Sequence, residues 1–179
     1  TELQEKSGAI HFKTADLDII INTTTGLIDR FKIGDVEYLT RNACRPVVIE
    51  DNADPWGMSV RSFRKNAGAF ALMDREKGTW FSGISRGPLD SVRIIEDGAI
   101  RTTVESVLTY EKSYICLRYK LPKQGTEIEI EARVLWNEKD KMLKLSFPTR
   151  LGAAGYIGQT AYGFQELPTN GDEAVAQKW

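Results

Sequence analysis

The stretch Glu127-Ile128-Glu129-Ile130-Glu131-Ala132-Arg133-Val134-Leu135-Trp136 decides the fold. Successive side chains of a β-strand point to opposite faces of the sheet, so strict alternation of apolar and charged residues indicates a strand. The apolar face would hold Ile128, Ile130, Ala132, Val134 and Trp136, and the polar face Glu127, Glu129, Glu131 and Arg133. One buried face and one solvated face are typical of an antiparallel sheet. We predict such a strand here, with Trp136 in the core.

Similar alternation covers most of the chain. The predicted strands are residues 17–22, 27–33, 36–39, 91–96, 99–105, 115–121 and 143–147. Glycine turns at Thr25-Gly26, Gly34-Asp35 and Asp97-Gly98 indicate hairpins, because the positive φ of glycine suits the strand twist. The strand at 143–147, stopped by Pro148, is expected to be the hairpin partner of 127–136. Helical periodicity is weak, and the one predicted turn of helix is at 172–177. The fold class is therefore all-β, an antiparallel sandwich.

Length and composition limit the classes of function. A chain of 179 residues is enough for one domain, which we expect to span residues 1–179. Its 24 Lys and Arg nearly balance its 25 Asp and Glu, which argues against a nucleic-acid partner. An apolar run of about 18 residues, as a membrane span requires, is absent. Cys44 and Cys116 fit no metal spacing and are expected to be buried thiols of a reducing compartment, which indicates a cytoplasmic protein.

The usual catalytic patterns are missing from the sequence. Zinc needs three or four converging His, Cys or carboxylate ligands, but the chain has one histidine, His11, expected at the surface or on an edge strand. A Gly-x-Ser-x-Gly elbow and a dinucleotide-binding glycine loop are also absent. The row Glu127, Glu129 and Glu131 is interpreted as a solvated face, neutralised across the strands by Lys141 and Lys144. We therefore predict neither a catalytic residue nor a metal ligand in this chain.

An acidic segment, Glu50-Asp51-Asn52-Ala53-Asp54-Pro55-Trp56-Gly57-Met58, follows the predicted buried strand 46–49. Carboxylates accept hydrogen bonds from sugar hydroxyls, and an aromatic ring packs on the apolar face of a pyranose. Asp51, Asp54 and Trp56 are thus the candidate substrate-binding residues. The alternative is an Asx-capped turn with Trp56 buried as an anchor.

Separated blocks resemble, in order, the C-terminal β-domain of retaining α-mannosidases of glycoside hydrolase family 38. The most specific is 134–148, where a Trp-Asn-Glu turn joins two strands and closes on Phe-Pro. It lies within the block 127–148, and the other blocks are 17–31, 50–58, 92–104, 113–115 and 162–170 with 176–179. In the last block Glu166-Leu167-Pro168 stands where the family usually has Arg-Pro.

The resemblance implies a galactose-mutarotase-like super-sandwich behind a catalytic α/β barrel of the same polypeptide. The barrel would hold zinc and an aspartate nucleophile, so no catalytic residue carries over to this chain. The implied function is a non-catalytic β-domain that supports the barrel and its sugar pocket in an enzyme acting on mannose-containing glycans. The family domain continues past the last block, so the chain resembles a truncated fragment. Its unpaired sheet edges are expected to cause self-association.

Two other functions are compatible with the predicted fold. A free-standing carbohydrate-binding module would need an exposed aromatic platform, for which Trp56 and Trp80 lie near predicted turns. An aldose epimerase would share the implied fold, but it needs acid and base groups on both sides of the sugar, typically histidines, and the single histidine argues against it.

Overall fold

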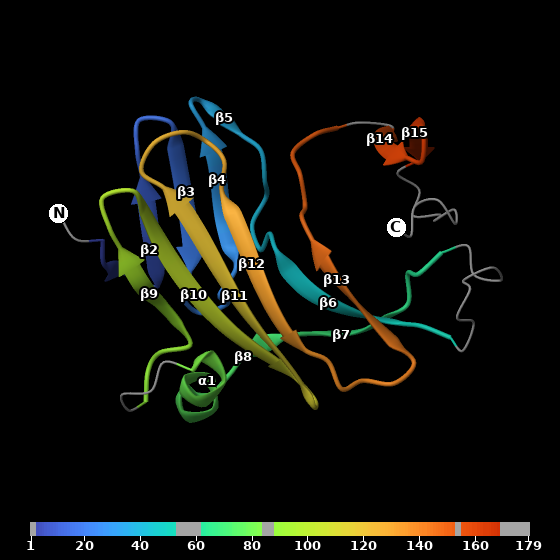
Figure 1. The fold of residues 1–179 in the computed structure, drawn as a ribbon, viewed down its shortest axis with the longest axis horizontal. Helices are drawn as coiled ribbons and strands as arrows, with labels where there is room; N and C mark the ends of the chain where they lie inside the picture. The colour runs from blue at the N-terminus through green and yellow to red at the C-terminus, as the bar shows by residue number, and fades with distance from the viewer. Residues whose placement is uncertain (1–2, 53–61, 84–87, 153–154, 169–179) are drawn as a thin grey trace.

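The computed structural model describes residues 3–52, 62–83, 88–152 and 155–168 (Figure 1). Nearly all regular structure in these ranges is β-strand. In chain order the elements are β1 (Glu5–Lys6), β2 (Ala9–Lys13), β3 (Leu17–Asn22), β4 (Ile28–Ile33), β5 (Val36–Glu37), β6 (Arg45–Glu50), β7 (Asn66–Ala69), β8 (Ala71–Leu72), α1 (Arg75–Ser82), β9 (Val92–Asp97), β10 (Arg101–Tyr110), β11 (Ser113–Pro122), β12 (Glu129–Leu135), β13 (Lys141–Ser146), β14 (Gly155–Thr160) and β15 (Gly163–Pro168). The all-β prediction is confirmed.

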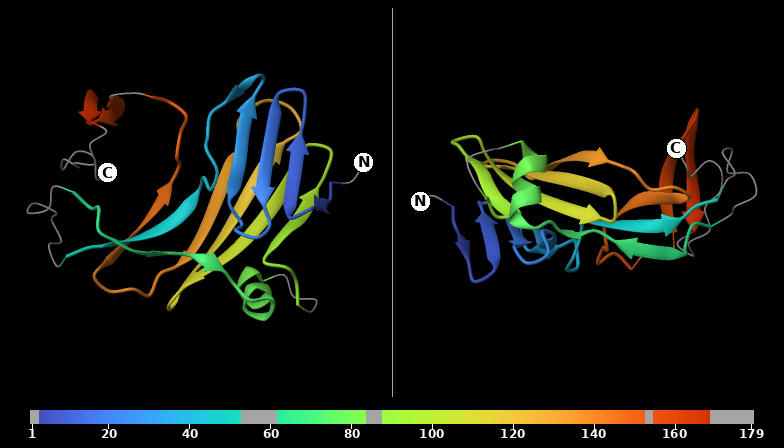
Figure 2. Two further views of the ribbon diagram at one scale, coloured as in Figure 1. Left: turned by 180° about the vertical axis from the view of Figure 1, so that it is seen from behind. Right: turned by 90° about the horizontal axis from the view of Figure 1, so that it is seen from below.

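Two antiparallel sheets form a sandwich, seen as two layers in Figure 2. The first sheet has the order β1-β2-β3-β4-β5, and the second has the order β12-β11-β10-β8, with β9 also paired to β10. The predicted glycine-turn hairpin β3–β4 is present in the first sheet, and the predicted β9–β10 hairpin in the second. The sandwich follows from the sequence, because each sheet has one apolar face that must be buried against another layer.

The core lies between the inner faces of these two sheets. On β11 the predicted stripe Ile115, Leu117, Tyr119 and Leu121 is fully buried. It packs in one cluster with the alternating apolar residues of β2 and β3. The buried hydroxyl of Tyr119 donates a hydrogen bond to the backbone oxygen of Gly26, 2.8 Å away. This bond joins the second sheet to the β3–β4 turn of the first and satisfies a polar atom that would otherwise be costly to bury.

The predicted hairpin between 127–136 and 143–147 is wrong. The strand β13 exists, but it pairs with β6 in a third sheet, of order β13-β6-β7. After β12, the Trp136 ring stacks on Phe70 with ring centroids 6.5 Å apart. The Glu138 carboxylate then accepts hydrogen bonds from the backbone N of Lys112 and the hydroxyl of Ser113, at 3.1 and 2.9 Å. These anchors lead the chain away from β12, so its next strand joins a different sheet.

Helix α1 was missed by the sequence prediction, and residues 172–177 lie outside the described residues. The side chain of Asp74 caps the N-terminus of α1 by accepting a hydrogen bond from the backbone N of Lys77. Gly83 ends the helix with a φ of 74°. The spacing of an Asp cap and a C-terminal glycine is a sequence signal for a short helix. It was overlooked because the helix is too short and too polar to show clear periodicity.

The turn between β9 and β10 lies slightly later than the predicted Asp97-Gly98. The backbone N of Gly98 donates to the backbone O of Arg101 at 2.9 Å, so the chain reverses between these two residues. Asp97 instead serves as an anchor for the loop. Its carboxylate accepts hydrogen bonds from the backbone N of Leu3 at 2.9 Å, from Lys123 at 2.5 Å and from Thr102 at 2.7 Å. These donors, the Leu3 amide above all, hold the pKa of Asp97 well below its usual value of 3.8.

We expect acid to destabilise the fold partly through Asp97. Because its folded-state pKa is depressed, the carboxylate contributes stability above its unfolded pKa of about 3.8. That stability is lost as the pH falls through the lower, folded-state pKa. Chemical unfolding measured from pH 6 to pH 2 should therefore show a decrease that is smaller in Asp97→Asn. An equal decrease in both proteins would contradict the assignment.

Candidate functional site

The first candidate site, the acidic segment after β6, is described only in part. Asp54 and Trp56 lie outside the described residues, and Asp51 is half-buried. The backbone N of Asp51 donates to the backbone O of Asp140 at 3.0 Å. Its side-chain oxygen accepts from the backbone N of Asn52 at 2.8 Å. This contact joins adjacent residues, so it is not the bond to the second following residue that defines an Asx-turn, and the Asx-capped turn stays a prediction. The role of Asp51, Asp54 and Trp56 in sugar binding stays a prediction.

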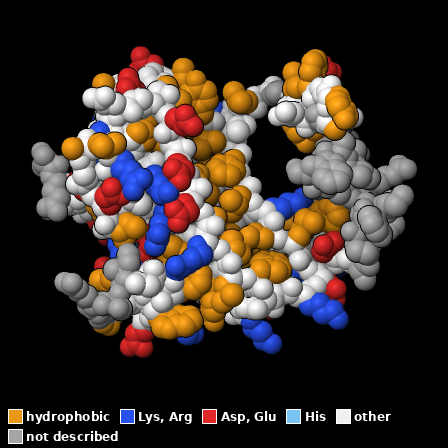
Figure 3. Space-filling model, in the orientation of Figure 1, with side chains coloured by type: hydrophobic (Ala, Val, Ile, Leu, Met, Phe, Trp, Pro, Cys, Tyr) orange, Lys and Arg blue, Asp and Glu red, His pale blue; other side chains and the backbone are white. Residues whose placement is uncertain are grey.

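A second set of polar residues crosses the outer face of the second sheet. The strand register places Arg93 of β9 opposite Glu105 of β10, Glu105 opposite Arg118 of β11, and Arg118 opposite Glu131 of β12. We call these four residues the charged row. Positive and negative side chains interleave over the β9–β12 sheet in Figure 3. Opposite charges on neighbouring strands stabilise the pairing, so the row reinforces the strand order.

Glu105 is the buried centre of the charged row. Its side chain is 1% exposed. One carboxylate oxygen lies 2.5 Å from an Arg93 nitrogen, and the other lies 2.9 Å from an Arg118 nitrogen. The thiol of Cys116 donates to the second oxygen at 3.3 Å. Arg93 also donates to the hydroxyl of Ser82, which ties α1 to the sheet. The buried carboxylate is thus fully engaged by neighbours, as a buried charge requires.

Both cysteines are buried free thiols, as predicted. Burial, with the nearby Glu105 carboxylate as the next cause, raises the pKa of Cys116 to about 12. Burial also raises the pKa of Cys44 to about 11. A thiolate rather than a thiol is the nucleophile, so neither side chain is activated for nucleophilic catalysis.

The glutamates of β12 are neutralised by the neighbouring strand β11, and the predicted partners Lys141 and Lys144 are wrong. Lys120 lies 2.6 Å from Glu129 and 2.8 Å from Glu131. The Lys120 hydrogen bond lowers the pKa of Glu131. Lys141 and Lys144 are on β13, which pairs with β6 rather than with β12.

The predicted apolar face of β12 is also less buried than expected. Val134 is 41% exposed, and Ala132 is exposed. The cause is the position of β12 at the edge of its sheet: within the described ranges it pairs with β11 alone. Apolar side chains form a visible stripe beside the charged row in Figure 3.

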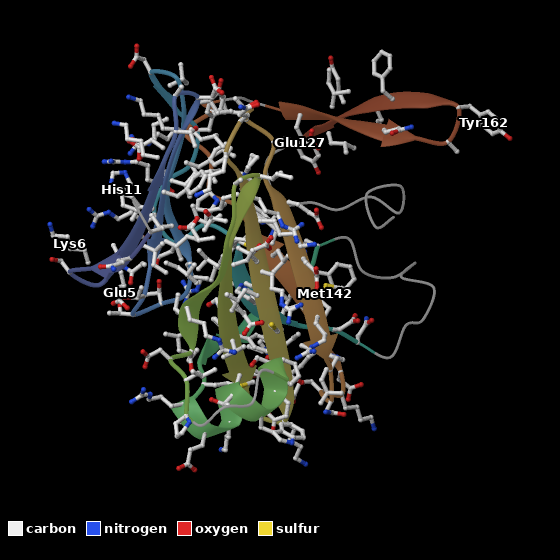
Figure 4. All side chains as sticks on the ribbon, turned by 60° about the vertical axis from the view of Figure 1, so that its left-hand side comes forward. Glu5, Lys6, His11, Glu127, Met142 and Tyr162 are labelled. Atoms are coloured by element: carbon white, nitrogen blue, oxygen red, sulfur yellow. The ribbon has the colours of Figure 1, made fainter. Side chains whose placement is uncertain are left out.

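The hairpin β14–β15 presents a further apolar surface, which we call the apolar arm (155–168). These two strands pair with each other and with no other described strand. Figure 1 shows the arm standing apart from the sandwich, and Figure 4 shows Tyr162 at its tip. Phe164 is 75% exposed and Ile157 is 67% exposed. An isolated two-stranded hairpin is marginally stable in water, so an arm of this kind needs a surface to pack on.

The described residues contain no group of three or more His, Cys, Asp or Glu side chains that could hold a metal ion. His11 lies on the exposed face of β2, where its ring nitrogen is 2.8 Å from Asp18. Its predicted surface position is confirmed. None of the helices in the ranges that the structure describes is long and apolar enough to cross a membrane.

Comparison with known families identifies the domain. A family model described as the glycosyl hydrolases family 38 C-terminal domain matches residues 37–179. The chain belongs to this family. Comparison with curated proteins finds no match.

The family 38 match covers all but one of the blocks on which the sequence resemblance was based. Residues 17–31 lie before its start at residue 37. The charged row and the apolar arm both include matched residues, and Arg93, Glu105, Arg118 and Glu131 all fall inside the match. As a C-terminal domain of a glycosyl hydrolase, the chain is part of a glycosidase whose catalytic domain belongs to the same polypeptide.

Sequence reasoning did not find the charged row. Its members alternate with other residues on four strands, and their alignment depends on the register of three strand pairs. A partial signal was present: Glu105, Arg118 and Glu131 lie at polar positions within alternating runs. Pairing the predicted strands in antiparallel order would have been needed to align them.

Proposed function

We propose that this chain is the non-catalytic β-domain of a retaining α-mannosidase, which hydrolyses terminal α-mannosides. The domain supports the catalytic barrel and the entrance of its sugar pocket. The observation that carries the proposal is the family 38 C-terminal match over residues 37–179. The substrate class comes from the sequence resemblance of the Trp-Asn-Glu turn block, 134–148, to the α-mannosidases of that family.

The apolar arm supports a packing role. Its exposed Ile157 and Phe164 side chains belong to a hairpin that the described strands leave without a sheet partner. Burying such side chains contributes roughly 25 cal/mol per Å² of apolar surface removed from water. The catalytic barrel of the same polypeptide is always at high effective concentration, so a contact of this kind forms without a separate association cost.

The chemistry of the proposed enzyme is assigned to the barrel. Zinc there would orient the sugar, and an aspartate would be the nucleophile of the retaining reaction. Two carboxylates of this chain have structural contacts: Glu105 bridges two arginines, and Asp97 anchors a loop. We propose that Asp51, Asp54 and Trp56 lie toward the barrel, because loops of rigid sandwiches commonly carry function.

The test is hydrolysis of p-nitrophenyl α-mannoside by this purified chain and by the parent polypeptide, with zinc and with a chelator. The parent is expected to release p-nitrophenol in the zinc-dependent condition, and the chain alone is expected to release none. Product stereochemistry followed by NMR should show α-mannose first, as retention requires. Zinc-dependent turnover by the chain alone would overturn the non-catalytic role, and a parent that cleaves other glycosides but not α-mannosides would overturn the substrate.

A free-standing carbohydrate-binding module is the second candidate. The observation that favours it is the Trp80 side chain on α1, which is 75% exposed. An exposed indole is suited to stacking on a pyranose ring. Titration of the chain with methyl α-mannoside, followed by tryptophan fluorescence, separates the two functions. A saturable signal that disappears in Trp80→Ala would favour the binding module.

A further inference from the structure

Among the described strands, β12 lies at the end of its sheet with its outer edge unpaired. On its inner side β12 pairs with β11 from Glu129 to Leu135, and the described residues place no strand on its outer side. Exposed strand edges present backbone N–H and C=O groups that another strand can pair with. Ala132 at the middle of the strand is exposed, so a second strand has access to this edge.

The sequence of β12 is complementary to itself in one antiparallel register. When two copies are related by a two-fold axis at Ala132, all seven residues of each strand overlap. Glu131 of each copy then lies opposite Arg133 of the other, and Ile130 lies opposite Val134. Directly opposite residues of antiparallel strands have closely spaced side chains, so both kinds of pair stabilise the association.

Neighbouring registers are less favourable. An axis at Glu131 places Glu131 opposite itself, and an axis at Arg133 places Arg133 opposite itself. Like charges directly opposite each other destabilise strand pairing. A two-fold axis midway between two residues would shift the register by one residue. The apolar side chains of one strand would then lie opposite the charged side chains of the other, because side chains alternate with a period of two. The Ala132 register alone combines full overlap with two pairs of opposite charge.

The charged row gives a second argument for the same register. It alternates in sign across β9, β10, β11 and β12, from Arg93 to Glu131 at the open edge. In the Ala132 register the next position in that row is Arg133 of the second copy. The alternation therefore gains one position across the junction in each direction, because Arg133 lies opposite Cys116 in its own sheet. Each Glu131 gains a cation beside Arg118 and Lys120, which it already meets on β11.

We propose that two copies of this domain associate through antiparallel pairing of their β12 strands, with the two-fold axis at Ala132. The second sheets of the two copies then form one continuous sheet. The expected self-association is thereby assigned to one surface and one register. The proposal does not depend on the substrate of the parent, so it stands or falls separately from the proposed function.

The test is analytical ultracentrifugation of the chain over a wide concentration range, with charge variants. Arg133→Glu places Glu opposite Glu twice and should weaken the dimer at least about tenfold. The double variant Glu131→Arg with Arg133→Glu exchanges the two charges and should recover most of that loss. Val134→Lys changes the apolar pair and should also weaken the dimer. Lys6→Glu is the matched control: it makes the same charge change as Arg133→Glu, but on β1, which belongs to the other sheet and lies at the left of Figure 4.

Two further measurements show whether the association uses β12 and whether each variant is folded. Hydrogen exchange of amides in 129–135 should slow as the concentration rises, because new inter-strand bonds form there. Thermal unfolding of each variant at a concentration where it is monomeric shows that the domain is folded. This matters because Arg133 also donates a hydrogen bond to the backbone O of Phe81 and lies over the Phe81 ring at 4.8 Å. A chain that stays monomeric at millimolar concentration would overturn the proposal. So would a dimer that Arg133→Glu and Val134→Lys leave as stable as Lys6→Glu does.

Discussion

Replacing Glu105 by alanine is expected to lower the free energy of unfolding by about 3–5 kcal/mol. The carboxylate is 1% exposed and lies within hydrogen-bond distance of Arg93 and Arg118, whose side chains are 11% and 27% exposed. Removing it leaves the Arg93 guanidinium without this counter-charge and leaves Arg118 with the more distant Glu131, 3.5 Å away. It also leaves the Cys116 thiol without its acceptor. The expected loss is large because a buried charge that loses its partner keeps its desolvation cost.

Urea unfolding of the variant beside the wild-type chain measures this loss. Glu129→Gln is the matched control, since Glu129 is 66% exposed and its pair with Lys120 lies at the sheet edge. An exposed pair of this kind contributes roughly 0–1 kcal/mol. Glu105→Gln keeps the shape of the side chain but removes its charge, and should fall between the two. Similar losses for Glu105→Ala and Glu129→Gln would show that the charged row does not depend on its buried centre.

The strands of this domain could be predicted from sequence because a strand with one buried face carries a local signal. Ile115, Leu117, Tyr119 and Leu121 alternate with polar residues, and all four are fully buried. The pairing between strands has no such local signal. Adjacent predicted strands 127–136 and 143–147 suggested a hairpin, yet β13 pairs with β6, nearly a hundred residues earlier in the chain. The anchoring contacts of Trp136 and Glu138 that redirect the chain are tertiary, and no local pattern contains them.

The candidate site was predictable to a smaller extent than the fold. Residue types suited to sugar binding mark Asp51 as a candidate, but its observed contacts are with the backbone of Asp140 and of the adjacent Asn52. The charged row involves residue types that alternation marks merely as solvent-facing. Its centre, Glu105, is fully buried, because α1 and the flanking arginines cover that part of the outer face. A face that is polar in sequence can therefore hold a desolvated network, and α1, which covers it, was the element that sequence reasoning missed.

The charged row and the open edge of β12 are two ends of one arrangement. Inside the sheet, alternating charges specify which strands lie side by side and in which register. At β12 the alternation ends on Glu131, while Arg133 sits two positions along the same face. Pairing of opposite charges on neighbouring strands, which supports the register within one copy, would therefore also support the register between two copies. The proposed pairing of two copies would therefore be specific rather than a general tendency to aggregate.

The second large effect is expected at Gly26 in the turn between β3 and β4. Its φ of 74° is a left-handed conformation, which glycine adopts without steric cost. A Cβ at this position would lie 1.9 Å from the Ser106 hydroxyl oxygen and 2.9 Å from a methyl carbon of Leu72. Gly26→Ala must therefore shift the turn or the Ser106 and Leu72 side chains that face it from the other sheet. It also disturbs the carbonyl that accepts the buried Tyr119 hydrogen bond. We expect a loss of about 2–4 kcal/mol, from backbone strain and overpacking together.

Gly8→Ala separates the two causes. Gly8 has a φ of 78°, nearly the same as Gly26, but a Cβ there would have nothing within 4 Å. Its alanine variant should show the backbone strain alone, about 1 kcal/mol. The difference between the two variants in urea unfolding then measures the close approach of the sheets at Gly26. Ser106→Ala combined with Gly26→Ala should recover part of that difference, because it removes the nearest atom. Equal losses of unfolding free energy in Gly8→Ala and Gly26→Ala would contradict this prediction. They would mean that the sheets can move apart at Gly26 without loss of stability, and that the Tyr119 hydrogen bond does not hold them together.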